Sequence, residues 1–261
     1  MLFRNHVAFA VILAATTLPL SAQSLAPTHA RCAIGISERA NEFSLHIGDD
    51  DCVGDHHCGM NFSNESMNRF TGITNADLAN DGAHHTASLT AEAGTFTCAG
   101  AVHDHELRGD SVFTPDSAFV DRMAKLGFAG FDSEKLQAYA FLNVTSGYAR
   151  SLQQAQIRGI TIDNLIALRI FKIDPAYARS FVAMGYEQPD ADKLIALKVQ
   201  GVNADEVKQI RAMGYQPDLD ELIQIRIFKI TPDFIQRMQD RGFKNLTIAK
   251  LVQIRIFKLA E

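Results

Sequence analysis

The chain of 261 residues has no tryptophan, and after residue 105 it has neither cysteine nor histidine. Lysine is absent from the first 116 residues. Residues 1–116 carry 5 basic and 14 acidic side chains, a balance of −9, whereas residues 117–261 carry 20 and 16, a balance of +4. This division predicts two parts with different roles. A net charge of −5 argues against a general nucleic-acid-binding protein.

The sequence also lacks the short motifs of common active sites. It has no G-x-S-x-G, no H-E-x-x-H, no phosphate-binding loop and no dinucleotide-binding fingerprint. We therefore expect a protein without enzymatic activity and without a cofactor.

Long apolar runs are scarce, and the one that matters lies at the N-terminus. Val7 to Leu20 follows a start that contains Arg4, and the small residues Ser21 and Ala22 come next, which is the order of a secretory signal peptide. A membrane-spanning helix needs about 20 apolar residues, and this run is shorter. We expect residues 1–22 to be removed, leaving a periplasmic or secreted protein that begins near Gln23 and is not inserted in a membrane.

Export changes the interpretation of the four cysteines, Cys32, Cys52, Cys58 and Cys98. An even number of cysteines in an oxidising compartment favours two disulfides, and three pairings are possible. The short connection between Cys52 and Cys58 favours that pair, which leaves Cys32 for Cys98.

The alternative is a zinc or copper site in the acidic part, because thiolate and imidazole are ligands of both metals. His103 and His105 are two residues apart on a possible strand and would share a face. The spacing matches no standard structural zinc pattern, so we favour disulfides. The candidate ligands are Cys52, His56, His57, Cys58, His103 and His105, with His84 and His85 as further donors.

Residues 23–115 are predicted to form a small antiparallel β domain. Short runs rich in Phe, Val, Ile and Thr alternate with turn residues, whereas Asn64–Asn80 is expected to hold a helical turn or a long loop. The predicted strands are Cys32–Ser37, Phe43–Gly48, Cys58–Ser63, Thr86–Ala91, Phe96–His103 and Ser111–Thr114, with turns at 49–51, 80–82, 93–94 and 108–110.

Residues 116–261 are predicted to form a helical repeat array of five two-helix units, which gives an α+β fold. Similar blocks begin at leucines spaced 29, 29, 28 and 29 residues apart, namely Leu136, Leu165, Leu194, Leu222 and Leu251. Asp174-Pro175 and Thr231-Pro232 are typical starts of the first helix of a unit. A glycine then ends this helix at one register, at Gly127, Gly185, Gly214 and Gly242, and the second unit has Gln156 there.

The second helix of each unit is apolar on most sides, and we expect it to be the more buried one. A single unit cannot bury its apolar face alone, so stacked units should form a solenoid with a grooved surface.

Two segments carry a family resemblance. TPDFIQRMQDRGF followed by LVQIRIFKL resembles tandem helical repeats in the extracytoplasmic parts of bacterial envelope proteins, some of them attached to metallopeptidase sensors of the beta-lactam-regulator type. AEAGTFTCAGAVHDHELRGDSVFTPDSAFVDRMAKLGF is similar to the strand-rich region before those repeats, so the resemblance covers roughly residues 85–261. It implies an envelope protein with a sensing or scaffolding role. The H-E-x-x-H motif and the membrane helices of the peptidase are absent, so proteolytic activity does not carry over.

Basic residues recur in three of the five units, at Arg169 and Lys172, Arg226 and Lys229, and Arg255 and Lys258. A spacing of three places both members of a pair on one helical face. They either bind an acidic partner or complement the C-terminal ends of helices. The sequence thus predicts an exported scaffold or sensory protein that binds a protein partner in the cell envelope through its repeats. The alternative function is metal binding by the β domain.

Overall fold

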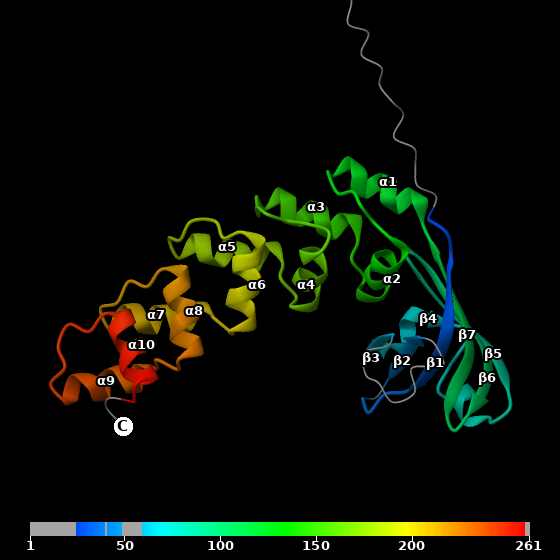
Figure 1. Ribbon diagram of the computed structural model, residues 1–261, viewed down its shortest axis with the longest axis horizontal. Coiled ribbons are helices and arrows are strands. Elements are labelled where there is room, and N and C mark those ends of the chain that lie inside the picture. The colour runs from blue at the N-terminus through cyan, green and yellow to red at the C-terminus, as the bar shows by residue number, and fades with distance from the viewer. Residues whose placement is uncertain (1–24, 40, 49–58, 259–261) are drawn as a thin grey trace, which may run out of the picture.

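The computed structural model describes residues 25–39, 41–48 and 59–258, which form a curled antiparallel sheet followed by ten helices. This confirms the predicted α+β fold. The sheet lies at one end, and the helices extend from it as an arch that places the C-terminus far from the sheet (Figure 1). The predicted signal peptide, Cys52, Cys58, His56 and His57 lie outside the described residues.

The described sheet has seven strands in the order β3-β2-β1-β7-β6-β5-β4. They are β1 (Thr28–Ile36), β2 (Glu42–Gly48), β3 (Met60–Ser66), β4 (Phe70–Thr71), β5 (His84–Ala91), β6 (Gly94–His103) and β7 (Glu106–Pro115). A single helical turn, η2 (Met67–Arg69), joins the two edge strands β3 and β4. The sheet therefore curls until its edges approach, and the rings of Phe43 in β2 and Phe70 in β4 are 5.7 Å apart. With η3 (Asp77–Ala79), this segment holds the helical turns expected there.

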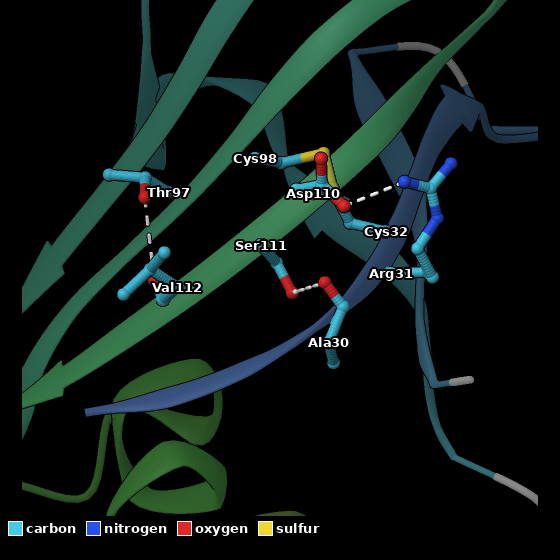
Figure 2. Close-up of a disulfide and its surroundings, with 8 residues drawn as sticks. All are labelled: Ala30, Arg31, Cys32, Thr97, Cys98, Asp110, Ser111 and Val112. Atoms are coloured by element: carbon cyan, nitrogen blue, oxygen red, sulfur yellow. Dashed lines mark hydrogen bonds and ion pairs between the residues drawn. A yellow bond between two sulfur atoms is a disulfide. The ribbon is translucent and has the colours of Figure 1, made fainter. Parts of the chain in front are cut away.

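A disulfide links Cys32 in β1 with Cys98 in β6, across the intervening strand β7 (Figure 2). The two Cα atoms are 6.0 Å apart, whereas strands separated by one neighbour in a flat sheet lie about 9–10 Å apart. The sheet therefore bends sharply at β7. Beside the bond, the Ser111 hydroxyl donates to the Ala30 carbonyl at 3.1 Å. The predicted pairing of Cys32 with Cys98 is confirmed.

The predicted turn at residues 108–110 is wrong. Gly109 lies inside β7, where it pairs with Cys32 on one side and Gly100 on the other. A Cβ atom on Gly109 would lie 2.0 Å from the Ala99 carbonyl oxygen, so the close approach of β6 and β7 requires glycine here. The chain reverses instead at Asp104 and His105, whose φ angles are 51° and 63°.

The ten described helices form five pairs that match the five predicted units. They are α1 (Ser117–Lys125), α2 (Ser133–Leu142), α3 (Ser146–Gln154), α4 (Asn164–Ile170), α5 (Pro175–Ala183), α6 (Ala191–Val199), α7 (Ala204–Ala212), α8 (Leu219–Ile227), α9 (Pro232–Asp240) and α10 (Ile248–Ile256). Nine of them follow an Asp, Asn or Thr whose side chain accepts a backbone N–H of the first turn. All four glycines that end the first helices have a left-handed backbone conformation, and Gln156 has the same conformation in unit 2, with a φ angle of 58°.

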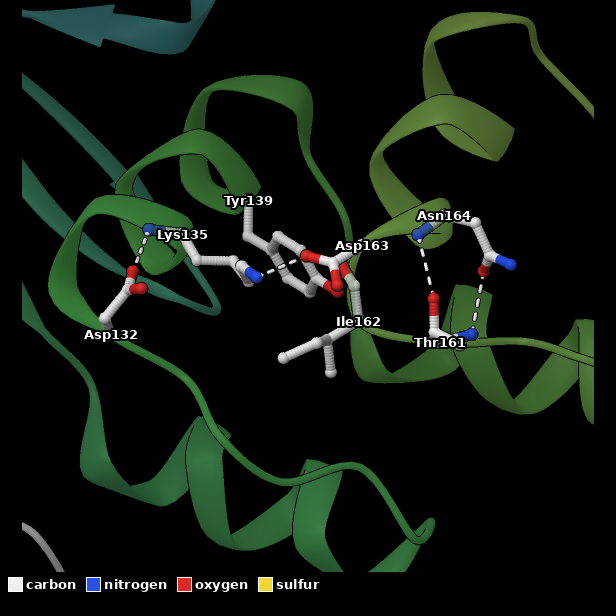
Figure 3. A network of polar contacts seen from close by, with 7 residues as sticks. All are labelled: Asp132, Lys135, Tyr139, Thr161, Ile162, Asp163 and Asn164. Atoms are coloured by element: carbon white, nitrogen blue, oxygen red, sulfur yellow. Dashed lines mark hydrogen bonds and ion pairs between the residues drawn. The ribbon is translucent and has the colours of Figure 1, made fainter.

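Neighbouring units are joined through their second helices, since α2, α4, α6, α8 and α10 contact one another in that order. Figure 3 shows the first junction, where Lys135 pairs with Asp163 and the Tyr139 hydroxyl donates to the Ile162 carbonyl at 2.7 Å. Lys193 and Asp220 repeat the ion pair between units 3 and 4. The leading leucine of each block is at most 1% exposed.

Candidate interaction surface of the helical array

The second helices of units 2 to 5 each expose one apolar side chain near the helix end. In units 2 to 5, the side chain five residues after the leading leucine is 51% exposed. Single exposed apolar side chains are ordinary on protein surfaces, but here the exposure recurs at one register of four successively stacked helices. We call Ile170, Val199, Ile227 and Ile256 the apolar stripe.

The same register in unit 1 is occupied by Phe141, which is only 1% exposed. Its ring stacks on Phe62 of β3 at 4.4 Å between centroids and meets Phe96 of β6 edge-on at 5.0 Å. The curled sheet thus covers, in unit 1, the position that stays open in the other four units.

Two charged side chains from connections between strands, Arg69 in η2 and Glu92 in the turn between β5 and β6, contact the ends of α2 and α3. The Arg69 guanidinium donates to the carbonyls of Ala140, at 2.6 Å, and Phe141 at the end of α2. The Glu92 carboxylate accepts the Ser146 N–H at 2.9 Å at the start of α3. A cation at a helix C-terminus and an anion at an N-terminus both interact favourably with the helix dipole.

The repeated arginines contact the end of the preceding unit. Their Nε atoms donate to backbone carbonyls at 3.0 Å (Arg169 to Leu142), 2.8 Å (Arg226 to Gln200) and 3.3 Å (Arg255 to Phe228). These contacts agree with the helix-end interpretation of the basic residues. Binding of a partner by the same arginines stays a prediction.

The same cationic register also faces the first helix of its own unit. Arg169 lies 5.6 Å from the centroid of Tyr148, Lys198 lies 4.4 Å from Tyr177, and Arg255 lies 4.4 Å from Phe234. In unit 4 the aromatic ring is replaced by Glu206, which pairs with Arg226 at 3.3 Å. Burial raises the pKa of the Tyr148 and Tyr177 hydroxyls to about 12, so both stay neutral hydrogen-bond donors.

The prediction that each arginine shares a helical face with the lysine three residues later is wrong. Lys172, Lys229 and Lys258 lie beyond the ends of their helices, in left-handed conformations with φ of 52°, 52° and 51°. All three are exposed, two residues after a stripe side chain. Each lysine therefore lies just beyond the helix end that carries a stripe residue. The spacing of three could not show this, because no residue of the repeat marks the end of the second helix as glycine marks the end of the first.

The histidines give no metal centre among the described residues. His103 ends β6, whereas His105 lies in the turn, with its Nδ1 atom 3.2 Å from the Leu78 carbonyl oxygen. The prediction that the two histidines share a strand face is therefore wrong. Within 25–39, 41–48 and 59–258, no three His, Cys, Asp or Glu side chains converge. The remaining candidate ligands, Cys52, His56, His57 and Cys58, lie outside those ranges, so the metal alternative stays a prediction.

Comparison with protein-family models, curated proteins and solved structures gives no match, so the resemblance to bacterial envelope repeats stays a prediction. None of the helices in the described ranges is both long enough and apolar enough to cross a membrane.

Proposed function

We propose that this chain is a non-enzymatic interaction protein whose helical array binds an acidic polypeptide partner across the apolar stripe, as an exported scaffold or sensory component of the cell envelope. The observation that carries the proposal is the repetition of one half-exposed aliphatic side chain in four successive units. A solenoid of stacked helices offers such a surface along its whole length.

The chemistry of the partner follows from what surrounds the stripe. Three of its four residues are followed, two positions later, by an exposed lysine, at Lys172, Lys229 and Lys258. At the first register, Phe141 is covered by the rings of Phe62 and Phe96. An occupant with apolar side chains therefore matches the stripe, and negative charge in the occupant matches the lysines.

The spacing of the units sets the spacing of the partner's side chains. Packed helices lie about 8–10 Å apart. This separation is close to the rise of seven residues of an α-helix, at about 1.5 Å each, and residues seven apart lie on one helical face. We expect a helical partner segment with apolar residues at this interval and acidic residues between them.

Selection from a phage-displayed library of random peptides tests the proposal on the full-length protein. A stripe variant with Ile170, Val199, Ile227 and Ile256 all replaced by Ser removes apolar surface at half-exposed positions, so its circular dichroism should match wild type. Peptides selected on wild type should be acidic with regularly spaced apolar residues, and should bind the stripe variant about tenfold more weakly or worse.

A second variant tests the charge requirement. Replacing Lys172, Lys229 and Lys258 by Gln should weaken binding and flatten its dependence on salt, because exposed charges are screened. The matched control is Lys208→Gln, which removes an exposed lysine of α7 away from the stripe and should have no effect. Peptides that are not acidic, or that bind wild type and stripe variant equally, contradict the proposal.

A further inference from the structure

A pocket of about 400 Å³, open to solvent, lies between units 4 and 5. Its walls include Met213, Tyr215, Glu221, Gln239 and Phe243. The pocket is formed by the loops that precede α8 and α10, whereas the apolar stripe lies at the opposite ends of these helices. It is therefore separate from the proposed partner surface.

The equivalent place between units 3 and 4 is filled by the chain itself. Arg211 of α7 lies with its guanidinium 4.8 Å from the centroid of Tyr186, and its Nη1 atom donates to the Met184 carbonyl at 2.7 Å. Burial raises the pKa of Tyr186 and the neighbouring Arg211 lowers it, which agrees with a cation held against this ring. A guanidinium can stack on an aromatic face while its N–H groups donate, within the plane of the guanidinium, to a carbonyl beside the ring.

One unit later the receiving groups remain and the cation is gone. Tyr215 stands at the register of Tyr186, and Met213 at that of Met184, but Gln239 replaces Arg211. The wall also gains a carboxylate, because Glu221 stands at the register of Lys193. The exposed ring of Phe243 adds a second aromatic surface. Gln239 in place of Arg211 and Glu221 in place of Lys193 both favour a positive charge that comes from another molecule.

We propose that this pocket binds the guanidinium group of an arginine side chain from another molecule. The guanidinium stacks on Tyr215, donates to the Met213 carbonyl as Arg211 does to Met184, and lies near the Glu221 carboxylate. Arginine fits better than lysine, since only a planar cation can stack on the ring and donate sideways at once. The proposal does not rest on the apolar stripe, so each stands or fails alone.

The probe is N-acetyl-arginine methylamide, titrated into the full-length protein and followed by the NMR signal of the Met213 methyl group. N-acetyl-citrulline methylamide is the neutral control of the same shape. The arginine probe should shift the Met213 signal in a saturable way, and the citrulline probe should need at least about tenfold higher concentration. N-acetyl-arginine, which has the same guanidinium and a free carboxylate, should bind more weakly than the methylamide, because Glu221 should repel that carboxylate.

Two variants on α9 separate pocket filling from a general change of charge. Gln239→Arg should place an internal guanidinium over Tyr215, abolish the shift caused by the probe and raise the melting temperature. Gln236→Arg adds the same charge at a position that does not line the pocket, and should leave the titration unchanged. Tyr215→Leu should lose probe binding without the gain in melting temperature. Equal shifts from arginine and citrulline probes, or wild-type affinity in Gln239→Arg, would overturn the proposal.

Discussion

Arg69 contacts both parts of the molecule, pairing with Glu65 at 2.6 Å and donating to the last carbonyls of α2. Burial raises the pKa of Glu65, and the neighbouring Arg69 opposes that rise. A carboxyl whose folded pKa is raised destabilises the fold above that pKa, and the penalty disappears as the pH falls through it. Without Arg69 this penalty at neutral pH should be larger.

We predict that Arg69→Met lowers the free energy of unfolding by about 2–4 kcal/mol at pH 7, because it leaves a buried carboxylate and two helix-end carbonyls without their donor. The loss should shrink at pH 4, where Glu65 takes up a proton. Urea unfolding at the two pH values measures both effects. Arg108→Met is the control, since its pair with Glu106 is 53% and 39% exposed and should matter by less than about 0.5 kcal/mol. A loss that does not change with pH contradicts the role of Glu65.

Gln156 is a single departure from glycine at the left-handed end of the first helices. Non-glycine residues in this conformation cost about 1 kcal/mol. We predict that Gln156→Gly stabilises the array by up to about 1 kcal/mol, and that Gly214→Ala destabilises it by a similar amount. A Cβ atom on Gly214 meets no atom within 4 Å, so backbone strain alone should act there. Thermal melting measures both variants, and no change in Gly214→Ala would exclude strain at this register.

Arg226 and Lys229 occupy different environments although both are cations near the end of α8. Arg226 contacts the Gln200 carbonyl and Glu206, whereas Lys229 is exposed in the left-handed residue after the helix. We predict that Arg226→Gln lowers the free energy of unfolding by about 1–2 kcal/mol, and that Lys229→Gln changes it by less than about 0.5 kcal/mol. Urea unfolding of the two single variants measures both changes. Equal losses of unfolding free energy would contradict the different roles of Arg226 and Lys229.

At the scale of helices and strands, the array could be predicted from sequence and the sheet only in part. Helix starts such as Asp174 and helix ends such as Gly185 are local signals, repeated once per unit. The sequence around Gly109 predicts a turn, because it does not show that β1, from much earlier in the chain, pairs with this residue on the side opposite to β6. The stripe was missed for the same reason, since the pattern around Ile170 and Phe141 is alike and only the sheet makes their burial different.

The repeat also predicts that one whole unit can be deleted without loss of the fold. Asp174 and Asn203 are the capping residues of α5 and α7 at the same register. Deleting residues 174–202 therefore joins Ile173 to Asn203 and lets Arg226 reach the carbonyls at the end of α4. We predict a cooperative, helical protein after this deletion, and loss of cooperativity after deletion of residues 188–202, which removes only α6. Circular dichroism during melting decides, and equal loss of structure in the two would contradict modularity.

At the scale of the whole molecule, the sheet closes the first end of the array, as terminal units of solenoids must. The disulfide between Cys32 and Cys98 strengthens that closing domain, since both side chains are buried and 66 residues apart in sequence. A bond of this span is expected to stabilise by about 4 kcal/mol in the chain-entropy description.

We predict that replacing both Cys32 and Cys98 by Ala lowers the stability of the sheet by about 2–4 kcal/mol. Units 3 to 5 should be affected much less, because each contacts only its neighbouring units. Hydrogen exchange measured by mass spectrometry separates the two, with faster exchange in β1, β6 and β7 and little change from α5 to α10. Uniformly faster exchange across the array would contradict this independence.

The position of β1 between β2 and β7 has a consequence for folding kinetics. Thr28 pairs with Phe113, so one of the two partners of β1 comes some eighty residues later in the chain, whereas helices α4 to α10 contact neighbours within about one unit. Long loops close slowly and local contacts form fast. Refolding from denaturant with the Cys32–Cys98 disulfide reduced should therefore show helical signal first and closure of the sheet later. Until β7 pairs with β1, the rings of Phe62 and Phe96 do not come together over Phe141. The first register of the array is therefore exposed at that stage, like the other four.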